Sequence, residues 1–461
     1  MFFNSIFNQI CRMFAVFAIA LSLFLNTAIS SAIAQTAEPE TFNVWVAGDA
    51  HITTDSLYGI ESLKLALRQS EGYWSPFFVE EEKDGVFLPV PAINWDIMLN
   101  LGDYSSSGFF PNDEEGRMVV DQYKALTKHY REDVYSVIGN HDANYYDQGP
   151  GSWFSKWIDP LGENTEFSGV NPELRRFPVT GTWEHYKFEA GNVLFLMLAD
   201  RNDVSNPVGR GNSEDHEFGG FPSGAVTRDT FNWWKQQIED NPEKIIITAH
   251  HHALKGTTTT SGFDDPSIHP GDGIGGYLAY IIENENPEEF QCTVYTDSPG
   301  LEDPDYPCEE IIGLGPFEQY LEDYYQEHGE PAIDLWLGAH SHSYPGEVVN
   351  GKGMTAKRWG VTFLQVGGLT HYYSAGVPLS RWLGFTDGSQ SLDIRMYIHR
   401  APYYSFINPE VAEEEDIPLP YTDVPKGAIK ENGWYEQPET YTIQLRRKFE
   451  APDPDTRPAK T

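Results

Sequence analysis

The sequence predicts an α/β fold, because short β-rich runs alternate with helical patterns along most of the chain. Two features of the composition agree with this fold class. The hydrophobic share is 40% and the aromatic share is 14%, which is enough for a substantial core. The 41 Gly and 31 Pro residues indicate many loops rather than a helical bundle. A chain of 461 residues can form one large domain with insertions or two ordinary domains.

The predicted strands and helices follow one another in order. Seven apolar runs are predicted as strands: Phe42–Gly48, Asp96–Gly102, Val134–Gly139, Val193–Asp200, Lys244–His250, Ile333–Gly338 and Val361–Gly367. Four segments with apolar residues three and four apart are predicted as helices: Leu57–Arg68, Met118–Tyr130, Asp229–Glu239 and Phe317–Gln326. Thr227 is positioned to cap the third helix.

The first 34 residues have the layout of a secretory signal peptide. Arg12 precedes the apolar run Met13–Leu25, and small residues then lead to a cleavage site after Ala34. The run is shorter than the roughly 20 residues of a membrane span, although an uncleaved anchor is the alternative. We therefore expect a secreted or periplasmic protein with no membrane span after cleavage.

The remainder divides into a main domain and an extension. We expect the domain to cover residues 35–400, with an insertion at about 256–315 that is rich in Gly, Pro, Asp and Glu. Residues 401–461 form an acidic, Pro-rich extension with one strand at Tyr441–Arg447 and a frayed tail. Cys292 and Cys308 lie in the insertion, and we expect them to form a disulfide in an oxidising compartment, the alternative being two free thiols.

The net charge of −38 limits the class of partner. Nucleic acids are bound through basic patches that neutralise phosphates, so we expect no nucleic acid wrapped around this surface. The charge does not exclude a small anionic substrate, and the oligomeric state is not indicated by the sequence.

Polar residues gather where five of the predicted strands end. They are Asp49 and His51, Asp103, Asn140, His141 and Asp142, His250, His251 and His252, and His340 and His342. Ligands of α/β sheets bind outside the carboxyl ends of the strands. Imidazole and carboxylate without thiolate suit borderline divalent metals, and Asp103 could bridge two ions with its two oxygens. Each motif alone is common in turns and helix caps, and it is their combination that favours a binuclear metal site.

These motifs resemble those of the calcineurin-like metallophosphoesterases. The matching residues are Asp49-Ala50-His51, Gly102-Asp103, Gly139-Asn140-His141-Asp142, His250 and His340-Ser341-His342, within about residues 42–369. The resemblance implies a four-layer α/β/β/α sandwich and two divalent or transition metal ions, such as Fe, Zn or Mn. It implies that one ion is held by Asp49, His51, Asp103 and His342, and the other by Asp103, Asn140, His250 and His340. His141 would contact the phosphate and help the leaving oxygen depart.

The sequence departs from the family pattern in three places. Ala339 separates Gly338 from His340, and its small side chain is expected to do little harm. Ser106 stands where purple acid phosphatases have a tyrosine, which argues against a tyrosinate-bound iron. The Asp-Arg-Gly stretch of the protein phosphatases is absent after Asp103. His251 is a rival ligand, but His250 is preferred because it is the first residue beyond the apolar run.

The resemblance implies a hydrolase of small phosphoric monoesters or diesters, in which an activated water attacks phosphorus in line. The alternatives are an inactive binding protein of the same fold, a single-metal hydrolase, and a nuclease acting on larger diesters. Loop residues that could contact the substrate are Arg201, Arg210, Lys255, Arg381, Trp153, Trp157, His371, Tyr372 and Tyr373. The alternative is an exposed position or an ion pair for the cationic residues and packing in the core for the aromatic ones.

Overall fold

The structure is a computed structural model. It describes residues 39–74, 88–89, 92–106, 111–142, 149, 151–202, 224–259, 261, 276–286, 288–296, 308–349, 351–373, 378–399, 434–435 and 440–460. The chain divides into two units, Met1–Glu40 and Thr41–Thr461, and the second unit is described below. The expected signal peptide lies outside the described residues. None of the helices in the described part of the chain is long and apolar enough to cross a membrane.

Two seven-stranded sheets form the centre of the described unit. The first has the order β23 (Trp434–Tyr435), β22 (Ser391–Ile398), β21 (Leu379–Thr386), β1 (Thr41–Ala47), β4 (Ile97–Asn100) and β5 (Val134–Ser136), and β24 (Tyr441–Gln444) also pairs with β22. The second has the order β19 (Thr355–Arg358), β20 (Val361–Gln365), β16 (Leu335–Gly338), β10 (Ile245–Ala249), β8 (Val193–Leu198), β7 (His185–Ala190) and β6 (Thr180–Gly181). Strands β1, β4 and β5 run parallel, as do β8, β10, β16 and β20, so their carboxyl ends meet at one edge of each sheet.

Alternation of side chains along β1 divides the hydrophobic core in two. Phe42, Val44 and Val46 face the second sheet and pack in the core between the sheets. Trp45 and Ala47 face the other way, and pack against helices α3 (Ser62–Ser70), α4 (Asp113–Tyr123) and α5 (Ser152–Trp157).

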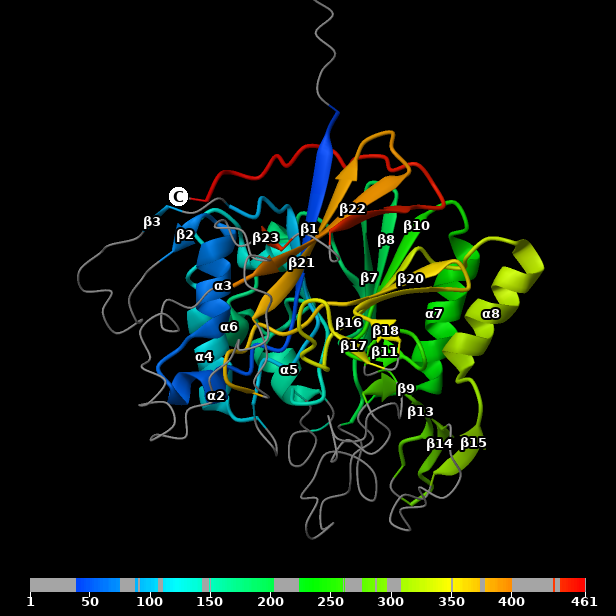
Figure 1. Cartoon of the computed structure of the whole chain (residues 1–461). Coiled ribbons are helices and arrows are strands. Elements are labelled where there is room, and N and C mark those ends of the chain that lie inside the picture. Colours follow the sequence, from blue (N-terminus) through cyan, green and yellow to red (C-terminus); the bar gives the residue numbers. More distant parts are fainter. Residues whose placement is uncertain are drawn as a thin grey trace, which may run out of the picture. The chain divides into compact units, whose positions relative to one another are not determined.

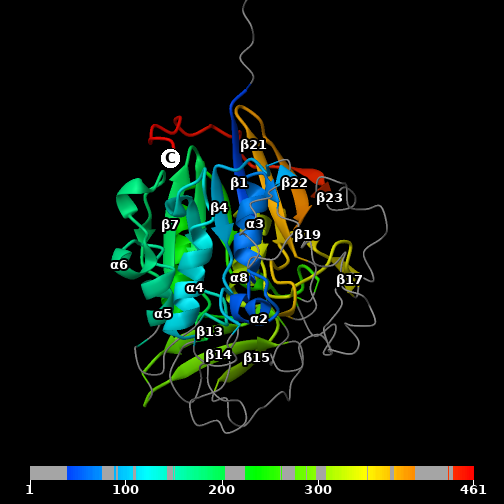
Figure 2. The same cartoon turned by 90° about the vertical axis from the view of Figure 1, so that its left-hand side faces the viewer.

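The second sheet shows the same division. Ile245, Ile247 and Ala249 of β10 face the first sheet, whereas Ile246 packs towards α7 (Arg228–Asp240) and α8 (Pro316–His328). Figure 1 shows α3 and α4 on one side of the strands and α7 and α8 on the other, and Figure 2 views the α3–α4 side. The predicted α/β/β/α sandwich is therefore confirmed.

Capping residues determine several helix ends differently from the expected ones. Asn112 caps α4 in a reciprocal capping box with Glu115, so this helix begins five residues earlier than predicted and ends at Tyr123. The predicted helix Leu57–Arg68 is two helices, α2 (Ile52–Leu57) and α3, because the chain turns at Gly59 with a positive φ of 72°. The predicted cap Thr227 does accept the Thr230 backbone N–H at the start of α7.

Three strands of the insertion form a small sheet with β9 (Ala225–Thr227), which precedes the insertion in the chain. The order is β15 (Glu309–Ile312), β14 (Gln291–Thr296), β13 (Tyr280–Asn284) and β9. Cys292 and Cys308 form the expected disulfide, with their Cα atoms 4.7 Å apart. The remaining elements are α6 (Thr165–Ser168), the 3-10 turns η2 (Arg131–Asp133) and η3 (Pro172–Leu174), and the pairs β2 (Tyr73–Trp74) with β3 (Leu88–Pro89), β11 (Ala253–Leu254) with β12 (Tyr277–Leu278), and β17 (Val348–Val349) with β18 (Lys352–Gly353).

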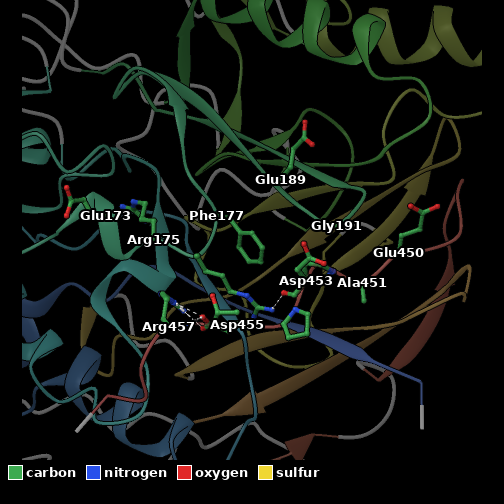
Figure 3. Close-up of a pocket in the computed structure, with 14 residues that line it drawn as sticks. Glu173, Arg175, Phe177, Glu189, Gly191, Glu450, Ala451, Asp453, Asp455 and Arg457 are labelled. Atoms are coloured by element: carbon green, nitrogen blue, oxygen red, sulfur yellow. Dashed lines mark hydrogen bonds and ion pairs between the residues drawn. The ribbon is translucent and has the colours of Figure 1, made fainter. Parts of the chain in front are cut away.

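The C-terminal tail was expected to be frayed, but its described residues bind the domain. Arg457 forms an ion pair with Asp133 at 2.7 Å and donates to the Leu174 carbonyl at 2.7 Å. Lys460 donates to the Leu126 carbonyl at 2.9 Å. The tail also lines a pocket of about 750 Å³, in which Figure 3 shows Arg457 beside Asp455. Gly191 in its wall precedes β8, so this pocket lies at the sheet edge opposite the strand ends that carry the motifs.

Candidate metal centre

The loops that follow β1, β4, β5, β10 and β16 bring the motif residues together. In the described part of the chain, ligand atoms within 4.8 Å of one another form three groups: Asp49, His51 and His342; His51, Asp103 and His141; and Asp103, His251 and His340. All these side chains except that of His141 are buried. Asn140 joins them, because its Oδ1 lies 3.0 Å from Nδ1 of His340. Six of the seven predicted ligands therefore lie in one cluster.

The structure brings His251, and not the predicted ligand His250, into the cluster. Nε2 of His251 lies 3.1 Å from Oδ2 of Asp103 and 3.2 Å from Nδ1 of His340. His250 belongs to none of the ligand groups found among the described residues, and its Nδ1 accepts the His252 backbone N–H at 2.9 Å. The physical reason is the alternation along β10: the inward series Ile245, Ile247 and Ala249 continues to residue 251, not to residue 250.

Backbone carbonyls fix the orientation of three imidazoles in this cluster. A carbonyl can only accept, so each Nδ1 beside one carries a proton, and Nε2 is the nitrogen that faces the cluster. The pairs are His51 Nδ1 with Ser105 O at 3.0 Å, His251 Nδ1 with Leu101 O at 2.7 Å, and His342 Nδ1 with Tyr373 O at 3.2 Å. Imidazoles held in this way, beside two carboxylates, fit divalent metal ions.

The electrostatics of the cluster favour bound cations. Although burial acts to lower it, the pKa of His251 is raised to about 10 by the negative charge of Asp103. Burial acts to raise the pKa of Asp103, but His251 and His141 hold it well below its usual range. Burial and the nearby His342 lower the pKa of His51. The two carboxylates thus attract positive charge to the centre, while His51 remains neutral and able to coordinate.

The backbone of the site is left-handed at several non-glycine positions. Among the described residues, eight non-glycine residues have positive φ, and five of them belong to the cluster: Asp49, His51, Asp103, His340 and His342, with φ between 40° and 67°. Such conformations are uncommon outside glycine and concentrate at functional sites. They turn each loop sharply after its strand, so that successive side chains can face the same point.

Glycines allow these loops to approach closely. A Cβ on Gly139 would lie 2.2 Å from Oδ1 of Asp103, and one on Gly102 would lie 2.2 Å from the Gly139 nitrogen. A Cβ on Gly48 would lie 3.2 Å from Cβ of Ala339, so the missing side chain of Gly48 leaves room for the alanine that interrupts the last motif. Ser106 Oγ accepts the Thr54 backbone N–H at 2.9 Å, next to α2.

Asp142 organises the loop that carries Asp103. Its buried carboxylate accepts the backbone N–H groups of Asp103 at 2.7 Å, Tyr104 at 2.8 Å, Ser105 at 3.1 Å and Gly139 at 3.1 Å. Burial and the charge of Asp103 raise the pKa of Asp142 to about 7. Its described contacts are those of a structural turn residue.

The cationic side chains considered as phosphate ligands have other partners. Arg201 is buried and pairs with Glu184 at 2.9 Å and Glu285 at 2.6 Å. Lys255 Nζ donates to the Gly313 carbonyl at 2.7 Å. Arg381 is buried and donates to the Gln365 carbonyl, whereas Arg210 lies outside the described residues. Trp153 and Trp157 belong to α5 and pack in the core with residues of α4.

Tyr373 lies in the site, although it was only one of several aromatic candidates in the sequence. Its ring stacks on His51, with centroids 3.9 Å apart and an interplanar angle of 10°. Its hydroxyl lies 3.1 Å from Nε2 of His141. The only sequence signal is its position in the loop after β20.

Comparisons with known proteins were made at three levels: family models, curated proteins and solved structures. The model of the family described as calcineurin-like phosphoesterase matches residues 42–344. None of the curated proteins matches the sequence. Solved structures that resemble the chain include vacuolar protein sorting 29 from Cryptosporidium parvum, with 10% identity over 78% of this chain and 93% of that chain and a TM-score of 0.24. Vps29 from Chaetomium thermophilum has 11% identity over 78% of this chain and 89% of that chain, with a TM-score of 0.25.

Proposed function

Because the chain belongs to the calcineurin-like phosphoesterase family, we propose that it hydrolyses phosphoric esters with the help of two metal ions. One ion would be held by Asp49, His51, Asp103 and His342. The other would be held by Asp103, Asn140, His251 and His340.

The observation that carries the proposal is the shared position of Asp103. Its carboxylate belongs to a group with His51 on one side and to a group with His251 and His340 on the other. The backbone N–H of His141 donates to Oδ1 of Asp103 at 2.7 Å, which helps to fix the orientation of the carboxylate. Oδ2 of Asp103 lies 3.7 Å from Nε2 of His51 and 3.1 Å from Nε2 of His251, so this oxygen stands between the two groups, as expected of a carboxylate that bridges two ions.

Each protein group has a defined task in this proposal. Two bound ions would supply the positive charge that activates a water and stabilises the phosphoryl oxygens. Asn140 contributes a neutral oxygen beside His340. His141 is the one half-exposed residue of the clustered groups, so it is the side chain that can reach a substrate and give a proton to the leaving oxygen.

We further propose that the substrate is a small phosphomonoester or phosphodiester and that the protein works outside the cytoplasm. The net charge of −38 disfavours long polyanions. The signal-like segment ending at Ala34 supports export. The disulfide between Cys292 and Cys308 is consistent with an oxidising compartment.

The test is hydrolysis of nitrophenyl phosphate and bis-nitrophenyl phosphate by the purified chain without residues 1–34. Mn, Zn, Fe, Co, Ni and Ca are added in turn to metal-free protein, and bound metal is measured by elemental analysis. We expect turnover with at least one metal at about two ions per chain, and loss of turnover in Asp103→Asn.

The outcomes separate the alternatives. Folded protein that binds metal but cleaves neither ester would support an inactive binding protein of this fold. Full activity at one ion per chain would support a single-metal hydrolase. Unchanged activity in Asp103→Asn would contradict the bridging role. Preference for oligonucleotides over both small esters would support a nuclease.

A further inference from the structure

Tyr373 touches three residues of the candidate centre in three different ways. Its ring stacks on His51, its carbonyl accepts Nδ1–H of His342 at 3.2 Å, and its hydroxyl lies 3.1 Å from Nε2 of His141. The ring of His141 lies at 80° to that of Tyr373. A single residue, 232 positions from His141 in the sequence, therefore contacts both the candidate ligands and the candidate proton donor.

The loop that carries Tyr373 is held by a buried carboxylate. Asp55 accepts the backbone N–H groups of His371 at 2.7 Å and Tyr372 at 2.9 Å, and the hydroxyl of Thr370 at 2.9 Å. The same threonine oxygen accepts the backbone N–H of Tyr373 at 3.0 Å. Bonds to a charged acceptor are among the stronger ones in proteins, so the position of Tyr373 is well defined.

We propose that Tyr373 is the positioning residue of His141. The Tyr373 hydroxyl oxygen accepts the Nε2–H of His141, which fixes the ring orientation and leaves Nδ1 as the nitrogen that gives a proton to the leaving oxygen. This inference rests on the proposed phosphoesterase function. It concerns one hydroxyl group, because the ring of phenylalanine could keep the stack on His51 and the backbone carbonyl would still bind His342.

The proton transfer balances with His141 alone as donor. As the oxygen of water forms its bond to phosphorus, the bond from phosphorus to the leaving oxygen breaks and its electron pair remains on that oxygen. The protons of the attacking water stay on the phosphate product, which later releases one to solvent. The leaving oxygen takes the Nδ1 proton of the imidazolium and departs as an alcohol. His141 is then neutral, with its remaining proton on Nε2 and donated to Tyr373.

The experiment compares Tyr373→Phe with Tyr325→Phe, which removes one hydroxyl from an exposed tyrosine of α8 outside the candidate centre. The first readout is the tautomer of His141 in metal-free protein, from the ¹⁵N NMR shifts of its ring nitrogens. The second is the dependence of kcat/KM on leaving-group pKa for a series of aryl phosphates. Bound metal is measured in parallel.

In Tyr373→Phe we expect a changed His141 tautomer signal, unchanged metal content, and a loss of about 10-fold or more for the poorest leaving group, since a general acid contributes about 10²–10⁴-fold. The loss should shrink for nitrophenol, which leaves without protonation. Adding Tyr373→Phe to His141→Ala should cost little more. Tyr325→Phe should match the wild type in every readout.

Unchanged His141 shifts in Tyr373→Phe would overturn the proposal, as would an equal loss for all leaving groups or a loss of bound metal. If the wild type hydrolyses no ester with any metal, the phosphoesterase proposal fails. The NMR comparison still decides whether Tyr373 orients His141, because it needs neither metal nor substrate.

Discussion

Replacing each of the two adjacent histidines by asparagine separates their roles. Asparagine retains a polar atom near the position of Nδ1 and removes Nε2, so His251→Asn can keep a bond to the Leu101 carbonyl and His250→Asn can keep one to the His252 N–H. Both histidines are fully buried, which makes the two variants a matched pair.

The expected magnitudes follow from the position of each Nε2. In His251 it lies 3.1 Å from the carboxylate of Asp103, so its loss removes one of four proposed ligands of an ion. Removing a residue that only supports a ligand costs about 10–100-fold in metal affinity, and removing a ligand should cost at least about 100-fold, or about 2.8 kcal/mol. His250→Asn should cost less than about 10-fold.

The assay is calorimetric titration of Zn or Mn into the metal-free variants, with elemental analysis after dialysis. Urea unfolding confirms that both variants are folded before titration. We expect His251→Asn to lose one ion per chain and His250→Asn to retain two. The opposite result would refute the assignment of His251 as a ligand and would support His250, the first residue beyond the apolar run, in its place.

Three further perturbations test how the fold supports this site. Asp142→Ala removes the acceptor of four backbone N–H groups, and at about 1 kcal/mol each it should lower the free energy of unfolding by about 4 kcal/mol in urea. Burial acts to raise the pKa of Glu71, but hydrogen bonds to its carboxylate lower it from 4.5 to about 2. A carboxyl group whose pKa is lower in the folded state contributes its full stabilisation above its unfolded pKa. We therefore expect the free energy of unfolding to fall by about 3 kcal/mol as the pH falls from about 5 to 2. In Glu71→Gln the free energy of unfolding should depend less on pH over this range. Reduction of the Cys292–Cys308 disulfide, which spans 16 residues, should lower the free energy of unfolding by about 3 kcal/mol in the same assay.

Each of these three predictions would be contradicted by a specific result. Asp142→Ala with wild-type stability would mean that the N–H groups find other acceptors. If the free energy of unfolding of Glu71→Gln falls with pH as much as that of the wild type, other carboxylates are responsible for the loss of stability in acid. Equal unfolding curves for oxidised and reduced protein would mean that the small sheet β13–β15 unfolds separately from the main transition.

The sequence predicts the sandwich because its strands are marked locally. Each of the seven predicted runs contains a strand of the structure, since unbroken apolar residues bounded by polar ones require burial on both faces. Helix ends were less predictable. The capping box of Asn112 and Glu115 and the turn at Gly59 are local features, but apolar periodicity alone does not detect them.

The site was predictable to the level of motifs and strand ends, but not to the level of individual nitrogens. His250 follows the apolar run directly, yet alternation along β10 directs residue 251 into the cluster. That signal is present in the sequence, provided the inward series is counted from Ile245. Tyr373 had no comparable signal, because its contacts depend on how the loop after β20 folds over the loop after β1.

By itself the sequence determined the fold class, the five motifs and the disulfide pair, because each depends on residues that are close in the chain or on a hydrophobic period. Only the tertiary structure decided that Asp103 is shared between two ligand groups, that His251 belongs to one of them and that Tyr373 meets His141. The cluster as a whole joins residues up to 291 positions apart, as in the contact between His51 and His342. They depend on the order of strands in two sheets and on left-handed turns at the strand ends, which no local pattern specifies.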